Sequence, residues 1–162
     1  MKRLIFFLLA YFLYFALFAN DGFTGKVQAV IDGNTLVIET TNEVRHTIYL
    51  TGIDCPELGQ EFGDHAKAYL EKLALQKEVE FTITGKDRWG NHLAMVTIKG
   101  IDIRIELLSE GLAWTAERNP LPALESVKES ARQHAKGLWQ QENPTPPWTY
   151  RRQQTMLQAK GS

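Results

Sequence analysis

Cysteine is almost absent from this sequence of 162 residues, because Cys55 is the only one. A lone cysteine excludes an internal disulfide, a CxxC redox pair and a cysteine-based zinc knuckle. A surplus of positive charge is also missing, since 18 Lys and Arg face 19 Asp and Glu, for a net charge of −1. This balance argues against a strongly cationic nucleic-acid coat. Of the four histidines, His46, His65 and His134 show no metal-ligand spacing, and His92 is expected to be a solvated turn residue, with a role as acid or base as the alternative.

Long apolar runs are confined to the N-terminus. Lys2 and Arg3 precede the uncharged run 4–19, which ends at Asn-Asp-Gly. This layout predicts a secretory signal, with Ala19 as the last residue before cleavage. The alternative is an uncleaved anchor, in which residues 4–19 provide the only membrane contact. Both predict export, to the periplasm or outside the cell. Removing residues 1–19 takes away two basic residues and no acidic one, which leaves a net charge of −3.

The rest of the chain alternates between two hydrophobic periods, which predicts a mainly β (α+β) domain over 20–141 and a Pro- and Gln-rich tail over 142–162. The period-two segments predict five strands, over 24–31, 35–39, 44–52, 79–83 and 93–97. The helical periods predict three helices, over 62–75, 104–110 and about 124–138. Five short strands with a helix before the fourth suggest a five-stranded OB-type barrel.

Four motifs follow one another along the predicted domain. They are VIDGNTL at 30–36, LTGIDCPE at 50–57, DRWGNHLA at 87–94 and EGLAW at 110–114. Their order and spacing closely resemble the staphylococcal nuclease family from about Gly25 to Trp139. The resemblance implies a five-stranded OB-type barrel with three helices. It also implies calcium-assisted hydrolysis of DNA and RNA phosphodiesters.

Four positions match residues that the family uses. Glu57 stands where the family's glutamate handles the attacking water, and Asp54 stands at a calcium-binding aspartate. Cys55 stands where the family uses only a backbone carbonyl as a calcium ligand. Asp32 keeps the first aspartate of the family's turn, and a turn-capping role explains it equally well.

Three charge-bearing positions differ from the family. The resemblance places Asn34 at the other calcium aspartate, and Tyr49 and Asn91 at the two phosphate-binding arginines. Calcium prefers several anionic oxygens, so Asn34 predicts a calcium site that is weak or absent. Losing two guanidinium groups removes several kcal/mol of transition-state stabilisation each, and about 1.4 kcal/mol is tenfold in rate. Arg45 is four residues from Tyr49 along one strand, about 13 Å, which is too far to replace it.

These substitutions favour a catalytically degenerate nuclease fold that serves a binding or assembly role at the cell envelope, with a partner that the sequence does not identify. One alternative is an active, metal-dependent exported endonuclease with Glu57 as base. A second alternative is a nucleic-acid-binding OB module that does not cleave, and whose binding weakens steeply with salt.

The tail contains aromatic residues next to basic ones. Trp148 and Tyr150, beside Arg151, are candidates for stacking on bases. A packed aromatic latch with a solvated basic end is the favoured interpretation, within a tail expected to be extended. The candidate ligand-binding residues are Asp32, Trp148 and Arg151.

Overall fold

The computed structural model describes residues 22–161. The strands are β1 (Phe23–Asp32), β2 (Thr35–Thr40), β3 (Arg45–Leu50), β4 (Ile53–Asp54), β5 (Glu78–Lys86), β6 (His92–Ile98), β7 (Ile101–Asp102) and β8 (Trp114–Thr115). The helices are α2 (Gly63–Ala74), α3 (Ile103–Ser109), α4 (Pro122–Gln133) and α5 (Pro147–Gly161), with a 3-10 turn η1 (Gly137–Gln140). All five expected strands and all three expected helices are therefore present, although the last helix ends five residues before its predicted end at 138.

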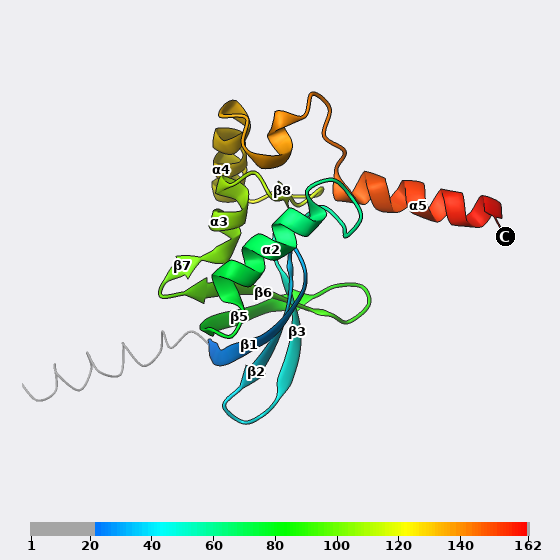
Figure 1. Cartoon of the computed structure of the whole chain (residues 1–162). Helices are drawn as coiled ribbons and strands as arrows, with labels where there is room; N and C mark the ends of the chain where they lie inside the picture. Colours follow the sequence, from blue (N-terminus) through cyan, green and yellow to red (C-terminus); the bar gives the residue numbers. More distant parts are fainter. Residues whose placement is uncertain (1–21, 162) are drawn as a thin grey trace, which may run out of the picture.

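Five of the strands close into a barrel (Figure 1). β1 pairs antiparallel with both β2 and β5, while β2 pairs with β3 and β5 with β6. The barrel closes because β3 and β6 run parallel, with Ile48 opposite His92 and Leu50 opposite Ala94. The expected five-stranded OB-type barrel, in a mainly β (α+β) fold, is confirmed.

Apolar side chains at alternate strand positions fill the barrel interior. Leu36 and Ile38 of β2, Ile48 of β3 and Phe81 of β5 are almost completely buried. Burying side chains of this size contributes about 1.5–3 kcal/mol each, which stabilises the inward-facing register of the strands. Helix α2 adds Ala66, Leu70 and Ala74 to the same core, because a spacing of four residues places them on one helix face.

The last predicted helix is shorter than its hydrophobic spacing suggested. Leu138 continues the pattern of Leu124 and Ala131, yet α4 ends at Gln133 and Leu138 lies in η1. The chain turns because Ala135 and Gly137 adopt left-handed φ angles of 48° and 51°. A Cβ on Gly137 would lie 2.3 Å from the carbonyl oxygen of Gly111, so backbone contact there requires glycine.

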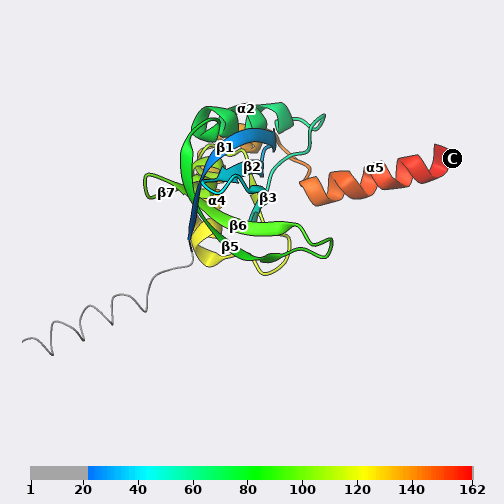
Figure 2. The same cartoon turned by 90° about the horizontal axis from the view of Figure 1, so that it is seen from below.

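The expectation of an extended tail is wrong for residues 147–161. Residues 147–161 form α5, which projects away from the barrel in both views (Figures 1 and 2). Pro147 is compatible with a first helical turn, and the following residues up to Lys160 include neither glycine nor proline. Arginine, glutamine, methionine, leucine and alanine in this stretch are all good helix formers.

The predicted signal or anchor over 1–19 lies outside the described residues. Within residues 22–161, none of the helices combines the length and the apolar character needed to span a bilayer.

Candidate functional site

The β1–β2 turn packs against the loop that follows β4. Asp32 accepts a hydrogen bond on Oδ1 from the backbone N–H of Asn34 (2.9 Å). Asn34 in turn accepts one on Oδ1 from the backbone N–H of Cys55 (3.3 Å). A Cβ on Gly33 would lie 2.6 Å from Cβ of Cys55 and 2.8 Å from Cβ of Ala66. Glycine at this turn therefore allows residues 32–34 and 54–57 to share one site.

The loop that carries Glu57 is held by a hydrogen bond to Gln60 in the same loop and by one from Gln60 to the C-terminal segment. The backbone N–H of Glu57 donates to Oε1 of Gln60 (3.1 Å), and Nε2 of Gln60 donates to the carbonyl of Thr145 (2.6 Å). A Cβ on Gly63 would lie 2.0 Å from the carbonyl oxygen of Glu57, so this loop lies directly on the first turn of α2. We call Asp32, Asp54 and Glu57 the carboxylate site.

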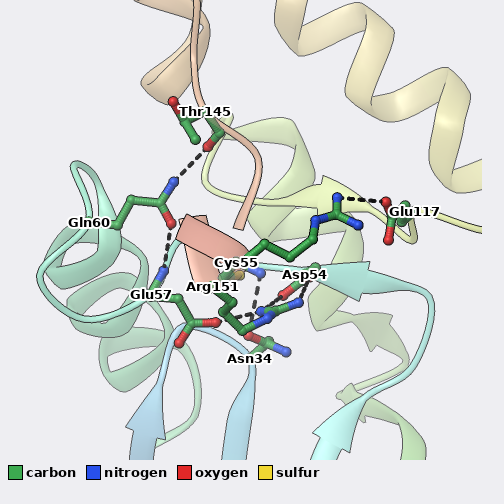
Figure 3. Close-up of polar contacts among 9 residues, drawn as sticks. Asn34, Asp54, Cys55, Glu57, Gln60, Glu117, Thr145 and Arg151 are labelled. Carbon is green, nitrogen blue, oxygen red and sulfur yellow. Dashed lines mark hydrogen bonds and ion pairs between the residues drawn. The ribbon is translucent and has the colours of Figure 1, made fainter. Parts of the chain in front are cut away.

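A guanidinium group from the C-terminal helix lies in the carboxylate site (Figure 3). Arg151 donates from Nη1 to Oδ1 of Asp54 (3.1 Å) and from Nη2 to Oδ2 of Asp54 (2.7 Å). Its Nη1 also donates to Oε1 of Glu57 (2.5 Å). The two carboxylates retained at family positions are therefore joined by one side chain that is 94 and 97 residues away in sequence.

Burial and charge oppose each other at Asp54. Burial raises the pKa of Asp54 above its usual value, and the negative charges of Glu57 and Asp32 raise it further. The hydrogen bonds and positive charge of Arg151 lower the pKa and offset part of this effect. The pKa of Arg151 is raised, mainly because its hydrogen bonds to Asp54 and Glu57 favour the charged form. Arg151 therefore keeps its positive charge next to the carboxylates of Asp54 and Glu57.

With Arg151 bonded to Asp54 and Glu57, the site does not fit a calcium ion. Calcium takes about six to eight oxygen ligands, with carboxylates preferred. Here Oδ1 of Asn34 accepts from Cys55, and both oxygens of Asp54 and one of Glu57 accept from Arg151. Within residues 22–161, no group of three or more His, Cys, Asp or Glu side chains is arranged to hold a metal ion. A weak or absent calcium site at Asn34, Asp54 and Cys55 stays a prediction.

The side chains at the two arginine positions are neutral and take part in the barrel structure. Nδ2 of Asn91 donates to Oδ2 of Asp87 (2.9 Å) and stabilises the β5–β6 turn. Tyr49 lies half-buried on β3, opposite Thr35 of β2 and Leu93 of β6.

Arg45 and His92, the two basic residues considered from the sequence, both have other partners. Arg45 forms an ion pair with Glu39 (2.6 Å), so its charge is used within the β2–β3 hairpin. His92 is half-buried as the first residue of β6 rather than solvated in the turn, with its ring centroid 5.8 Å from that of His46.

The tail docks through the aromatic residues singled out from the sequence. The ring of Trp148 packs edge-on against Trp114 at a centroid distance of 5.7 Å, and the hydroxyl of Tyr150 donates to the carbonyl of Gly59 (3.4 Å). The packed aromatic latch is therefore confirmed. Its basic end is not simply solvated, because Arg151 binds Asp54 and Glu57, and Arg152 forms an ion pair with Glu117 (3.0 Å). Ligand binding by Asp32, Trp148 and Arg151 stays a prediction.

Sequence reasoning did not find the pairing of Arg151 with Asp54 and Glu57. The available signal was a pair of adjacent arginines after a Trp-Tyr latch, in a domain whose retained site residues are acidic. Opposite charges favour such a pairing, but no local pattern states which acid meets which arginine.

Cys55 is enclosed behind the carboxylate site. Its side chain is 1% exposed, and Sγ donates to the carbonyl of Gly33 (3.2 Å). Burial raises the pKa of its thiol well above the usual value, and the charges of Asp54 and Asp32 raise it further. Because the thiolate is the reactive form, the folded protein is unsuited to use Cys55 as a nucleophile.

We expect Cys55 to resist a thiol reagent such as Ellman's reagent in the folded protein at pH 8, and to react fully in denaturant. The rate in native buffer should follow the opening of the fold, and should fall at least a hundredfold below that of the denatured chain. A reaction as fast as that of the unfolded thiol would contradict this enclosure.

The fold and site define a nuclease-type OB barrel with an acidic loop site. The family model described as "Staphylococcal nuclease homologue" matches residues 47–141. A Haemophilus influenzae protein named "Uncharacterized endonuclease" is 34% identical over 137 residues, covering 84% of this chain and 77% of the relative. An Escherichia coli protein of the same name is 35% identical, covering 78% and 84%. A Shigella flexneri protein named "Micrococcal nuclease" is 30% identical, covering 80% and 81%. The chain therefore belongs to the staphylococcal nuclease family.

Proposed function

We propose that this chain is a staphylococcal nuclease-type domain that no longer performs the family's calcium-assisted hydrolysis and that uses its barrel for binding or assembly at the cell envelope. The observation that supports this proposal is the charge around Asp54 and Glu57. The barrel supplies acidic and neutral side chains around these two carboxylates. Within the described part of the chain, the one guanidinium bonded to them belongs to Arg151 of α5.

The chemistry of phosphodiester cleavage explains why this matters. Attack on the phosphorus adds negative charge to oxygens that are already anionic, so the transition state needs cationic groups that are free to hold it. Arg151 donates three hydrogen bonds to carboxylates, and Tyr49 and Asn91 carry no charge. A substrate phosphate at Glu57 would therefore be surrounded by acids without a free cation.

A cleavage assay on single-stranded DNA and RNA tests the proposal directly. We expect the native chain with calcium to cut no faster than its Glu57→Gln variant or a chelator control. The triple substitution Asn34→Asp, Tyr49→Arg and Asn91→Arg, combined with Arg151→Gln, should raise cleavage by orders of magnitude, since it restores a carboxylate and two guanidinium groups. Calcium-dependent cleavage by the native chain that Glu57→Gln abolishes would overturn the proposal.

An active metal-dependent endonuclease with Glu57 as base is the second candidate. It is supported by the side-by-side placement of Asp54 and Glu57, whose positions match the family's, and by the names of the relatives. Under this reading Arg151 would have to leave at least one carboxylate before a metal ion could bind.

We also propose that the domain acts after export, on the basis of Lys2 and Arg3 followed by the apolar run 4–19. Its partner would be an envelope or extracellular molecule. Binding to nucleic acid without cleavage would be recognised by an affinity that falls steeply with salt.

A further inference from the structure

The contacts of Arg151 make it the internal counter-ion of the carboxylate site. Its guanidinium meets both oxygens of Asp54 at 2.7 and 3.1 Å and one oxygen of Glu57 at 2.5 Å. A paired fork of this kind is among the stronger arrangements of charged hydrogen bonds. The Asp54 side chain is only 19% exposed, so the pair is shielded on the aspartate side. Removing the guanidinium would leave a mostly buried carboxylate without a partner.

The segment that delivers this guanidinium rests on the barrel through a small set of contacts. Trp148 packs on Trp114, Tyr150 donates to Gly59, and Gln60 reaches the carbonyl of Thr145. From Arg151 to Lys160, the residues of α5 are exposed. Figure 3 shows Arg151 reaching from the start of α5 toward Asp54 and Glu57. The attachment of α5 therefore combines the contacts of Trp148 and Tyr150 with the ion pairs of Arg151 and Arg152, and Arg151 is the one of these that reaches the carboxylate site.

Charge balance shows which kind of ligand competes for this position. Asp32, Asp54 and Glu57 carry three negative charges, against one positive charge from Arg151. An added phosphate would meet these acids and a guanidinium that already donates three hydrogen bonds. An added cation would meet carboxylates alone once Arg151 moved away. The site thus favours exchange of one cation for another over capture of an anion.

We propose that Arg151 is the resident cation of the carboxylate site, that it clamps α5 onto the barrel, and that a divalent cation reaches Asp54 and Glu57 only by displacing it. Metal binding and docking of α5 are then mutually antagonistic. This proposed role of Arg151, which we call the clamp, does not depend on the proposed loss of hydrolysis. It concerns which cation occupies the carboxylate site and not whether the site cleaves a phosphodiester.

Terbium(III), an ion that stands in for calcium and luminesces when excited through nearby tryptophans, tests the clamp on the native chain. We expect Arg151→Gln to tighten terbium binding at least tenfold over the native chain, with calcium competing for the same site. The matched control is Arg152→Gln, which removes the same charge from the same helix but pairs with Glu117. Its affinity should stay within about threefold of native.

Two results of the terbium experiment would overturn the clamp. One is equal tightening by Arg151→Gln and Arg152→Gln, which would show a general charge effect. The other is an Arg151→Gln variant that binds terbium no better than the native chain.

Hydrogen exchange on the unmodified chain provides a second test that needs no variant. At the calcium concentration that displaces terbium from the native chain, amides of residues 148–153 should exchange at least fivefold faster than in sodium chloride of equal ionic strength. Unchanged exchange would contradict the antagonism. Neither test measures cleavage. Nuclease activity of the native chain would overturn the proposed function without affecting the clamp. Failure of the terbium or exchange test would overturn the clamp without affecting the proposed function.

Discussion

Replacing Asp102 by alanine should lower the free energy of unfolding by about 3–5 kcal/mol, because it leaves a buried arginine without its counter-ion. Arg104 is 5% exposed and donates from Nε and Nη2 to the carboxylate of Asp102, with the shortest contact at 2.6 Å. Asp102 also caps α3 by accepting from the backbone N–H of Arg104 (3.0 Å). A single substitution thus removes a counter-ion and a helix cap.

Urea unfolding followed by circular dichroism measures this loss. The double variant Asp102→Ala with Arg104→Met is the control, since it removes the buried charge together with its partner. We expect it to recover part of the lost stability, although Arg104 also donates from Nη1 to the carbonyl of Thr51 (2.9 Å). A single variant within about 1 kcal/mol of the native protein would show that Arg104 reaches solvent.

Replacing Gly63 by alanine should cost about 2–3 kcal/mol and loosen the carboxylate site, because the new methyl group overlaps backbone atoms. Its Cβ would lie 2.0 Å from the carbonyl oxygen of Glu57 and 2.8 Å from the carbonyl carbon. Backbone cannot rotate out of the way as a flexible side chain can, so the Glu57 loop must shift.

The control for Gly63→Ala is Gly85→Ala, since nothing lies within 4 Å of a Cβ at that position. We expect this control to change stability by less than about 0.5 kcal/mol, as surface substitutions usually do. Thermal unfolding compares the two variants, and hydrogen exchange at residues 57–60 reports on the loop. Equal stability of both variants would contradict the close packing of this loop on α2.

The strands and the helices α2 and α3 could be predicted because their hydrophobic patterns are contained within their own segments. Alternation along 35–39 places Leu36 and Ile38 inside, and a spacing of four residues places Ala66 and Leu70 on one face of α2. Each pattern needs only the residues of its own segment. The motifs at 30–36 and 50–57 likewise state which residue types stand at the site, although not how they are paired.

Two features of the secondary structure were mispredicted, the end of α4 and the conformation of the tail. The end of α4 is set by the left-handed backbone at Ala135, a residue type that normally favours helices. The extended tail was inferred from its prolines, which are confined to residues 144, 146 and 147, before the helical stretch begins.

The sequence by itself determined the barrel, the family and the chemical types at the site: two retained acids at Asp54 and Glu57, and neutral residues at Asn34, Tyr49 and Asn91. Only the tertiary structure decided where the charge of Arg151 goes. Electrostatic attraction and hydrogen bonding act through a few ångströms of space, whereas this arginine stands 97 residues from Asp54 along the chain. Its position follows from how Trp148 and Tyr150 seat α5, and that contact exists only once the barrel has closed.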